Sequence, residues 1–164
     1  SAIPTSHPGS TEAVYTLVRR FIKTGVLFLM AGLALGAWLL VRRELFGIFP
    51  HPHLVSAHAH AIFVGFVMFL IFGVALWLFP RAARDDRRYT PERAELSYRV
   101  LTVATGARFL SEASRAWSDS RLLAWIVVLG GVGQAVGIAI YFWTMWSRIR
   151  PVGSQIREAR GEKF

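Results

Sequence analysis

Apolar residues dominate four stretches of this chain, and short polar segments separate these stretches. The stretches run over residues 14–41, 52–79, 95–117 and 122–146. A helix that crosses the hydrocarbon core of a bilayer needs about 20 predominantly apolar residues. We therefore predict an all-α fold, a bundle of four transmembrane helices. An N-terminal tail (1–13) would precede the bundle and a basic cytoplasmic tail (148–164) would follow it.

Proline and glycine positions support these boundaries. Pro52 suits the first turn of the second helix, and Pro80 suits its end. Small residues let helices approach closely within a membrane. Two groups of glycines are spaced for this, one in the first predicted helix and one in the last: Gly25, Gly32 and Gly36, and Gly130, Gly133 and Gly137. We expect them to permit close contact with a neighbouring helix or with a second chain.

The third predicted helix differs from the others because its apolar core, residues 100–110, is short and contains Arg108. A charge at the centre of a spanning helix costs about 2.5–3.5 kcal/mol on insertion scales. Arg108 belongs to a stripe of six residues that are spaced three or four apart and so share one helix face: Tyr98, Leu101, Thr105, Arg108, Glu112 and Arg115. This stripe should face protein or a cofactor. The alternative is a ladder of Arg108, Glu112 and Arg115 that only staples two helices or reaches to the surface.

The net charge of +9 does not indicate nucleic-acid binding, because the basic residues flank the apolar stretches. Positive charges concentrate on the cytoplasmic side of membrane proteins. One side would hold Arg19, Arg20, Lys23, the arginines of residues 81–99 and the basic tail, and the other would hold Arg42, Arg43, Arg115 and Arg121. We predict a protein of the cell membrane with both termini in the cytoplasm. Cysteine is absent, which excludes disulfides, thiolate metal sites and covalently attached haem.

Four histidines fall within ten positions at the start of the second helix: His51, His53, His58 and His60. Imidazole is costly in hydrocarbon and is the commonest metal ligand among side chains. In a helix, His58 and His60 differ by about 200°, so they point to opposite faces. His53 and His60 share a face, and His51 can fold over the helix end. These three could bind copper, and zinc would suit them equally. The alternatives are solvated loop residues for His51 and His53, and a hydrogen-bonded core residue for His60.

One motif resembles a known family. It runs from His58-Ala-His60-Ala-Ile-Phe-Val-Gly65-Phe66 through Ile71-Phe72-Gly73 to Pro80-Arg81. It resembles the second transmembrane helix of heme-copper oxidase subunit I, especially in short stand-alone proteins of that type. The third helix is more weakly similar to the NnrS family. The resemblance implies that His58 is an axial ligand of haem b. It also implies haem propionates on the outer side, where Arg108 and Arg115, oriented by Glu112, could pair with them.

The chain departs from that family in two ways. It has no histidine after His60, so it lacks the second axial ligand and the catalytic binuclear centre, and no catalytic residue can be assigned. One His58 per chain supplies one iron ligand, and a two-fold axis would supply another, so we expect a homodimer. The expected function is electron transfer or binding of a diatomic gas (NO or O2). The alternatives are an accessory protein that handles copper or haem for oxidase assembly, and a structural subunit whose histidines are idle.

Overall fold

The computed structural model describes residues 8–80, 88–149 and 160–161 of the chain. Its elements are α1 (Pro8–Phe46), α2 (Pro52–His60), the π-helical segment η1 (Ala61–Met68), α3 (Phe69–Leu78), α4 (Pro91–Ser114), α5 (Arg121–Met145) and the 3-10 turn η2 (Trp146–Arg148). The part of the chain that is described contains no strand. The all-α prediction is therefore confirmed.

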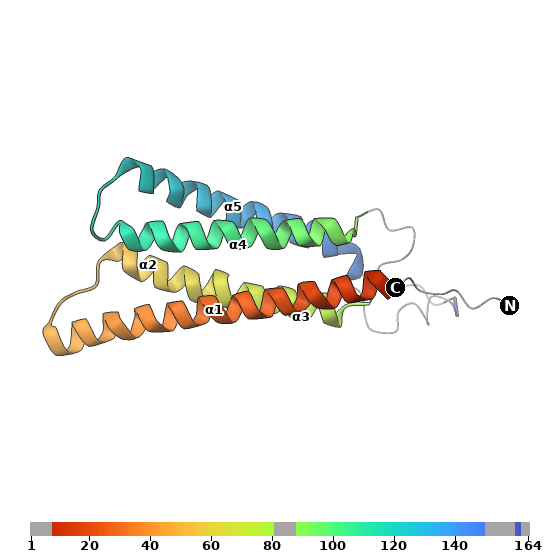
Figure 1. The fold of residues 1–164 in the computed structure, drawn as a ribbon, viewed down its shortest axis with the longest axis horizontal. Coiled ribbons are helices and arrows are strands. Elements are labelled where there is room, and N and C mark those ends of the chain that lie inside the picture. Colours follow the sequence, from red (N-terminus) through yellow and green to blue (C-terminus); the bar gives the residue numbers. More distant parts are fainter. Residues whose placement is uncertain (1–7, 81–87, 150–159, 162–164) are drawn as a thin grey trace.

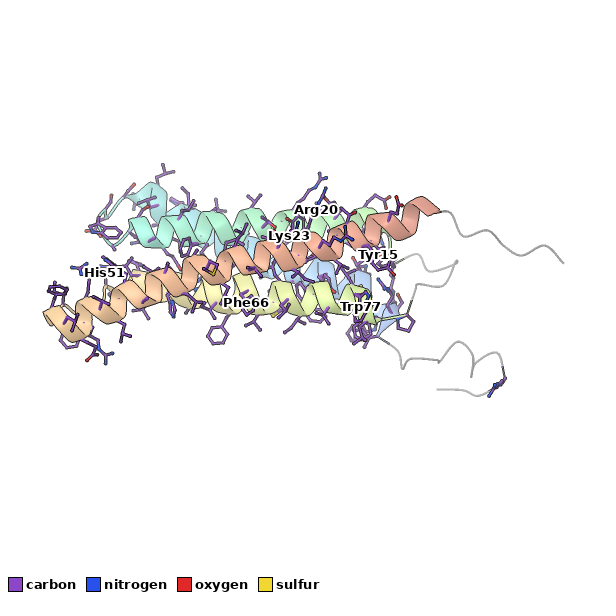
Figure 2. The ribbon with its side chains drawn as sticks, turned by 60° about the horizontal axis from the view of Figure 1, so that its bottom comes forward. Tyr15, Arg20, Lys23, His51, Phe66 and Trp77 are labelled. Atoms are coloured by element: carbon purple, nitrogen blue, oxygen red, sulfur yellow. The ribbon has the colours of Figure 1, made fainter. Side chains whose placement is uncertain are left out.

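The helices form two antiparallel hairpins that lie side by side (Figure 1). Segments α2, η1 and α3 follow one another without a break and pack against α1, whereas α4 packs against α5. Contacts between α2 and α4 join the two hairpins. The α1–α2 and α4–α5 turns lie at one end of the bundle, which we call the His51 end. In Figure 2 the label of His51 marks this end, and those of Tyr15 and Trp77 mark the opposite one.

Among the described residues, three helical stretches are long and apolar enough to cross a membrane: Val14–Phe46, Pro52–Leu78 and Arg121–Arg148. Large apolar side chains lie exposed along them, such as Leu27 and Leu129, which are 70% and 65% exposed. Such surfaces suit contact with lipid chains. Helix α4 is long enough to accompany them, but its six charged residues make it less apolar: Glu92, Arg93, Glu95, Arg99, Arg108 and Glu112.

Several helix ends differ from the predicted ones, for reasons of local capping. Helix α1 extends beyond residue 41 to Phe46, because no residue before Gly47 interrupts the helix. At Gly47 the backbone turns to a φ of +62°. There the amide groups of Gly47 and Ile48 donate to the carbonyls of Arg43 and Arg42, which closes the helix end. Helix α4 begins at Pro91, before the predicted residue 95, because the Thr90 hydroxyl accepts the amide of Arg93.

Some predictions fall partly outside the described residues. The predicted N-terminal tail (1–13) is one, since residues 1–7 are not described and α1 already begins at Pro8. The segment between the second and third predicted helices includes residues 81–87, which also lie outside the described part. Most of the predicted basic tail (148–164) lies there too.

Both glycine groups are used for packing within the chain. A Cβ atom at Gly25, Gly32 or Gly36 of α1 would meet Phe69, Ile62 and His58, at distances of 3.3, 2.7 and 2.5 Å. On α5, Gly130, Gly133 and Gly137 face Arg108, Ala104 and Leu101 of α4 just as closely. The predicted close approach is confirmed. These faces are occupied by the chain's own helices, so they do not offer the dimer contact that we expected from them.

The buried core lies toward the end opposite His51. It is built on aromatic rings, with Phe21 of α1 at its centre and Phe69, Phe72, Tyr98 and Tyr141 around it. The rings of Phe72 and Tyr141 stack with centroids 3.8 Å apart, and the Tyr141 hydroxyl donates to the Phe72 carbonyl. At the edge of this core, buried Arg148 donates to the carbonyl of Leu76 in the last turn of α3 and to those of Phe79 and Pro80, which follow the helix. Aromatic packing and the contacts of Arg148 therefore hold this end of the bundle together. The histidines lie nearer the other end.

Candidate functional site

A π-helical segment follows directly after His58 and His60. It covers Ala61–Met68, where the backbone makes wider turns than in the α-helices on either side. π-Helices are rare, and they occur frequently at functional sites. Because the segment is wound differently, it also sets how the histidines of α2 are rotated relative to the core residues of α3. The irregular part of this helix therefore adjoins the histidine motif.

His58 faces α1. Its Nδ1 lies 2.8 Å from the carbonyl oxygen of Gly32, and its ring lies against Gly36. A carbonyl oxygen can only accept, so Nδ1 carries the hydrogen and donates it. In the neutral ring Nε2 then holds the free lone pair, the form in which imidazole binds a metal or a haem iron. The backbone of α1 therefore fixes the tautomer of His58.

His60 faces α4, on the other side of α2, as expected from helical geometry. Its Nδ1 lies 2.9 Å from the carbonyl oxygen of Ser56, one turn earlier, and 3.7 Å from Oε2 of Glu112. The Ser56 hydroxyl donates to Oε1 of the same carboxylate at 3.0 Å. The stripe of α4 and the histidine helix therefore meet at the same level of the bundle, and the histidine next to the stripe is His60.

Arg108 of the stripe is held by two partners. Its Nε donates to Oε1 of Glu112, and its Nη1 donates to the side-chain oxygen of Gln134 on α5. The amide nitrogen of Gln134 in turn donates to the hydroxyl of Thr105. These contacts tie α4 to α5, which is what the stapling alternative predicts for Arg108. A role of Arg108, Glu112 and Arg115 toward haem propionates stays a prediction.

Two polar atoms of the stripe are buried without a hydrogen-bond partner in the described part of the structure. They are Oε2 of Glu112 and Nε of Arg115. Glu112 itself is only 2% exposed. One of its oxygens is thus well paired, while the other has only His60 nearby. Burying a carboxylate oxygen without a hydrogen bond costs free energy. Glu112 therefore has one oxygen, Oε1, that is stabilised by hydrogen bonds and one, Oε2, that is not.

His51 and His53 lie at the His51 end, separate from this polar cluster. Their rings stack with centroids 5.3 Å apart, and Nδ1 of His51 accepts the backbone amide of His53. The three histidines considered for copper are not brought together, since His60 is engaged with Ser56 and Glu112. Across the described ranges, no group of three or more His, Cys, Asp or Glu side chains is arranged to hold a metal ion.

Sequence reasoning missed Ser56 and Gln134, which complete the polar cluster. Ser56 precedes His60 by one helical turn, a spacing at which side chains meet. Gln134 is the most polar side chain in the long apolar run of α5. A buried polar group needs a hydrogen-bond partner. The isolated amide of Gln134 in an apolar run therefore could have indicated a polar contact with another helix. Its partner on another helix could not be read from the sequence.

Comparisons with known proteins supply no family for the chain. No protein-family model, no curated protein and no solved structure matches it. The resemblance of residues 57–81 to heme-copper oxidase subunit I therefore stays a prediction, and any function has to be argued from the residues themselves.

Proposed function

We propose that this chain is an integral membrane haem b-binding protein in which His58 is an axial ligand of the iron. The observation that carries the proposal is the contact of His58 Nδ1 with the Gly32 carbonyl. It leaves Nε2 as the nitrogen with a free lone pair, and the Gly32 carbonyl holds the ring in one orientation, as ligand histidines usually require. A bound haem b supplies reversible one-electron chemistry, or an open iron position for a diatomic gas such as NO or O2.

The surroundings of His58 suit a hydrophobic macrocycle in two respects. The side chain is partly exposed on the α1 side of α2, and its neighbours Gly32, Gly36 and Ile62 are uncharged. Arg108 and Glu112 lie on the α4 side, beside His60, so the contacts of His58 give no support to them as propionate partners. This chain's own contribution is to hold the ring, fix its tautomer and keep charged groups away from it.

Further parts of the proposal concern the membrane. We propose that α4 crosses the bilayer with the three apolar spans, because its polar stripe turns toward α2 and α5 while Val103 and Leu110 are exposed. The charge distribution favours both termini in the cytoplasm. The His51 end then lies on the outer side of the cell membrane.

We further propose a homodimer, because one chain offers a single histidine on the face of His58. A two-fold axis would bring a second His58, and a bis-histidine iron is suited to electron transfer. A five-coordinate iron would instead bind gas. Rapid formation of a carbon monoxide adduct by the ferrous protein would indicate an open position. Light scattering, corrected for detergent, gives the mass, and a monomer with a fully occupied six-coordinate haem would contradict the dimer.

The test of haem ligation compares two histidines that differ mainly in the face of α2 they occupy. His58→Ala should abolish the Soret absorption band of the purified protein while circular dichroism still reports the helical fold. His60→Ala should keep the Soret band, because His60 is turned toward Glu112. Full haem in His58→Ala, combined with loss of haem in His60→Ala, would show that the iron ligand is His60 and that our assignment to His58 is wrong.

Copper binding is a separate proposal, linked to the alternative function of an accessory protein that handles copper or haem for oxidase assembly. The observation in its favour is the pair of stacked, accessible rings of His51 and His53. Metal analysis should find copper, or zinc, in excess of iron only while His51, His53 and His60 are intact. Equal metal content in the triple alanine variant would remove the copper site. Haem that does not stay bound or cycle reversibly would favour the accessory function.

A further inference from the structure

A cavity of about 200 Å³ opens at the His51 end, apart from the contacts of His58 and His60. Helix α1 contributes Leu39 and Arg42 to its wall, the α1–α2 turn contributes residues 48–51, and Leu54 and Trp117 also line it. Pockets for drug-sized ligands measure about 300–1,000 Å³. This cavity is smaller, so it suits a small polar group rather than a whole cofactor.

Arg42 is the charged residue of this cavity, and no described residue forms an ion pair with it. The adjacent Arg43 differs, because its Nε donates to Glu44 at 2.8 Å. The guanidinium carbon of Arg42 lies 4.7 Å from the centre of the Trp38 ring, a cation–π contact that orients the group without using its N–H donors. Arg42 therefore offers a forked set of donors with no carboxylate to receive them.

The other polar side chains on the wall can also donate. Nδ1 of His51 accepts the amide of His53, so in the neutral ring the hydrogen is on Nε2. The indole nitrogen of Trp117 can only donate. None of the residues on the wall is acidic. A cavity whose side chains only donate, and which contains one unpaired arginine, is suited to an anion with several oxygen acceptors.

The position of the cavity indicates which class of anion can reach it. Phe49 of its wall is 83% exposed, and the ring of Trp117, also on the wall, lies with its centroid 6.4 Å from that of Trp38. Aromatic residues of this kind mark the level of the lipid headgroups. We propose that this cavity binds an anionic phosphate group, held by the guanidinium of Arg42 and by His51 Nε2. The phosphate can come from a phospholipid headgroup or from soluble phosphate.

The test uses the full-length protein in detergent and takes Arg43 as the matched control. The protein is equilibrated with phosphatidylglycerol, and the retained lipid is counted by native mass spectrometry. Arg42→Leu should weaken retention about tenfold, equivalent to about 1.4 kcal/mol, and Arg43→Leu should behave as the wild type. If Arg42→Leu fails to fold, Arg42→Lys replaces it. That variant keeps the charge, but it loses the two parallel donors and should still retain less lipid.

A second arm distinguishes the source of the phosphate. Inorganic phosphate is added and compared with chloride at equal ionic strength. Retention that depends on Arg42 and resists inorganic phosphate identifies the lipid as the ligand. Displacement by inorganic phosphate, together with Arg42-dependent broadening of its phosphorus NMR signal, identifies soluble phosphate. Equal lipid retention and equal broadening in the wild type, the Arg42 variant and the Arg43 control would overturn the proposal.

Discussion

For His51, His58 and His60, one local contact decides which ring nitrogen is available for chemistry. His58 and His60 both direct Nδ1 to a backbone carbonyl, of Gly32 and of Ser56, which leaves Nε2 with the lone pair in the neutral ring. His51 does the reverse, since its Nδ1 accepts an amide. In the neutral rings, Nε2 of His58 can therefore accept, as our haem proposal requires, whereas Nε2 of His51 can donate, as our phosphate proposal requires. Residue type alone would have treated the two as equivalent.

The contact of His58 depends on a glycine that can be tested. A Cβ at position 36 would lie 2.5 Å from Cε1 and 2.8 Å from Nδ1 of His58. Gly36→Ala should therefore displace the ring, weaken its hydrogen bond to Gly32 and cost about 1–3 kcal/mol. Thermal unfolding measures this cost, and the Soret band measures the effect on haem.

The matched control for this substitution is Gly106→Ala. Position 106 is also inside a helix, and nothing lies within 4 Å of an added Cβ. There alanine should stabilise the protein by about 0.5–1 kcal/mol, because glycine is unfavourable in a helix interior. Equal unfolding temperatures and equal Soret bands in the two variants would show that the close approach of α1 to His58 affects neither the stability of the fold nor haem binding.

At the scale of elements, α4 is the least apolar helix and the one with the most polar contacts to other helices. It meets α2 through Glu112 and Ser56, and it meets α5 through Arg108 and Gln134. Removing one partner from a buried ion pair typically costs about 3–5 kcal/mol, because the other charge is left uncompensated. Replacing both partners by apolar residues is often much cheaper.

We therefore predict strong coupling between Arg108 and Glu112. Arg108→Leu and Glu112→Leu should each lower the free energy of unfolding by about 3–5 kcal/mol, and the double variant should lose less than the sum of the two. Together with the wild type these variants form a double-mutant cycle, and reversible unfolding in detergent measures the stability of all four proteins. The exposed pair of Arg20 and Glu95 is the control and should couple by about 0–1 kcal/mol. Additive losses at Arg108 and Glu112 would mean that the two charges do not depend on each other.

The helices themselves could be predicted because each apolar run is long and ends at a proline, a glycine or a charged group. The π-helical segment could not. Residues 61–68 are all apolar, so their pattern has no polar face from which the number of residues per turn could be read. The polar stripe of α4 was visible from its spacing, but its partners were not. Gln134 lies 26 residues from Arg108, and only the packing of α5 on α4 brings the two together.

At the scale of the whole molecule, the topology places the histidine motif at the same end of the bundle as both hairpin turns. Both helical hairpins turn at the His51 end, while α3 ends and α4 begins at the opposite end (Figure 1). The basic residues near that opposite end include Arg19, Arg20 and Lys23 of α1. If positive charge sets the orientation, the histidine motif and the Arg42 cavity are both on the outer side. A copper or phosphate ligand would then have to arrive from outside the cell or from the outer leaflet.

This orientation can be tested by cysteine labelling, because the chain contains no cysteine of its own. Phe49→Cys places a thiol at an exposed position of the His51 end, and Glu92→Cys places one at an exposed position of the first turn of α4. A maleimide that cannot cross membranes should label Phe49→Cys in intact cells. It should label Glu92→Cys only after the membrane is permeabilised, because the basic flank keeps that end in the cytoplasm. The reverse pattern would place the histidines inside, and labelling of both variants in intact cells would contradict a single orientation.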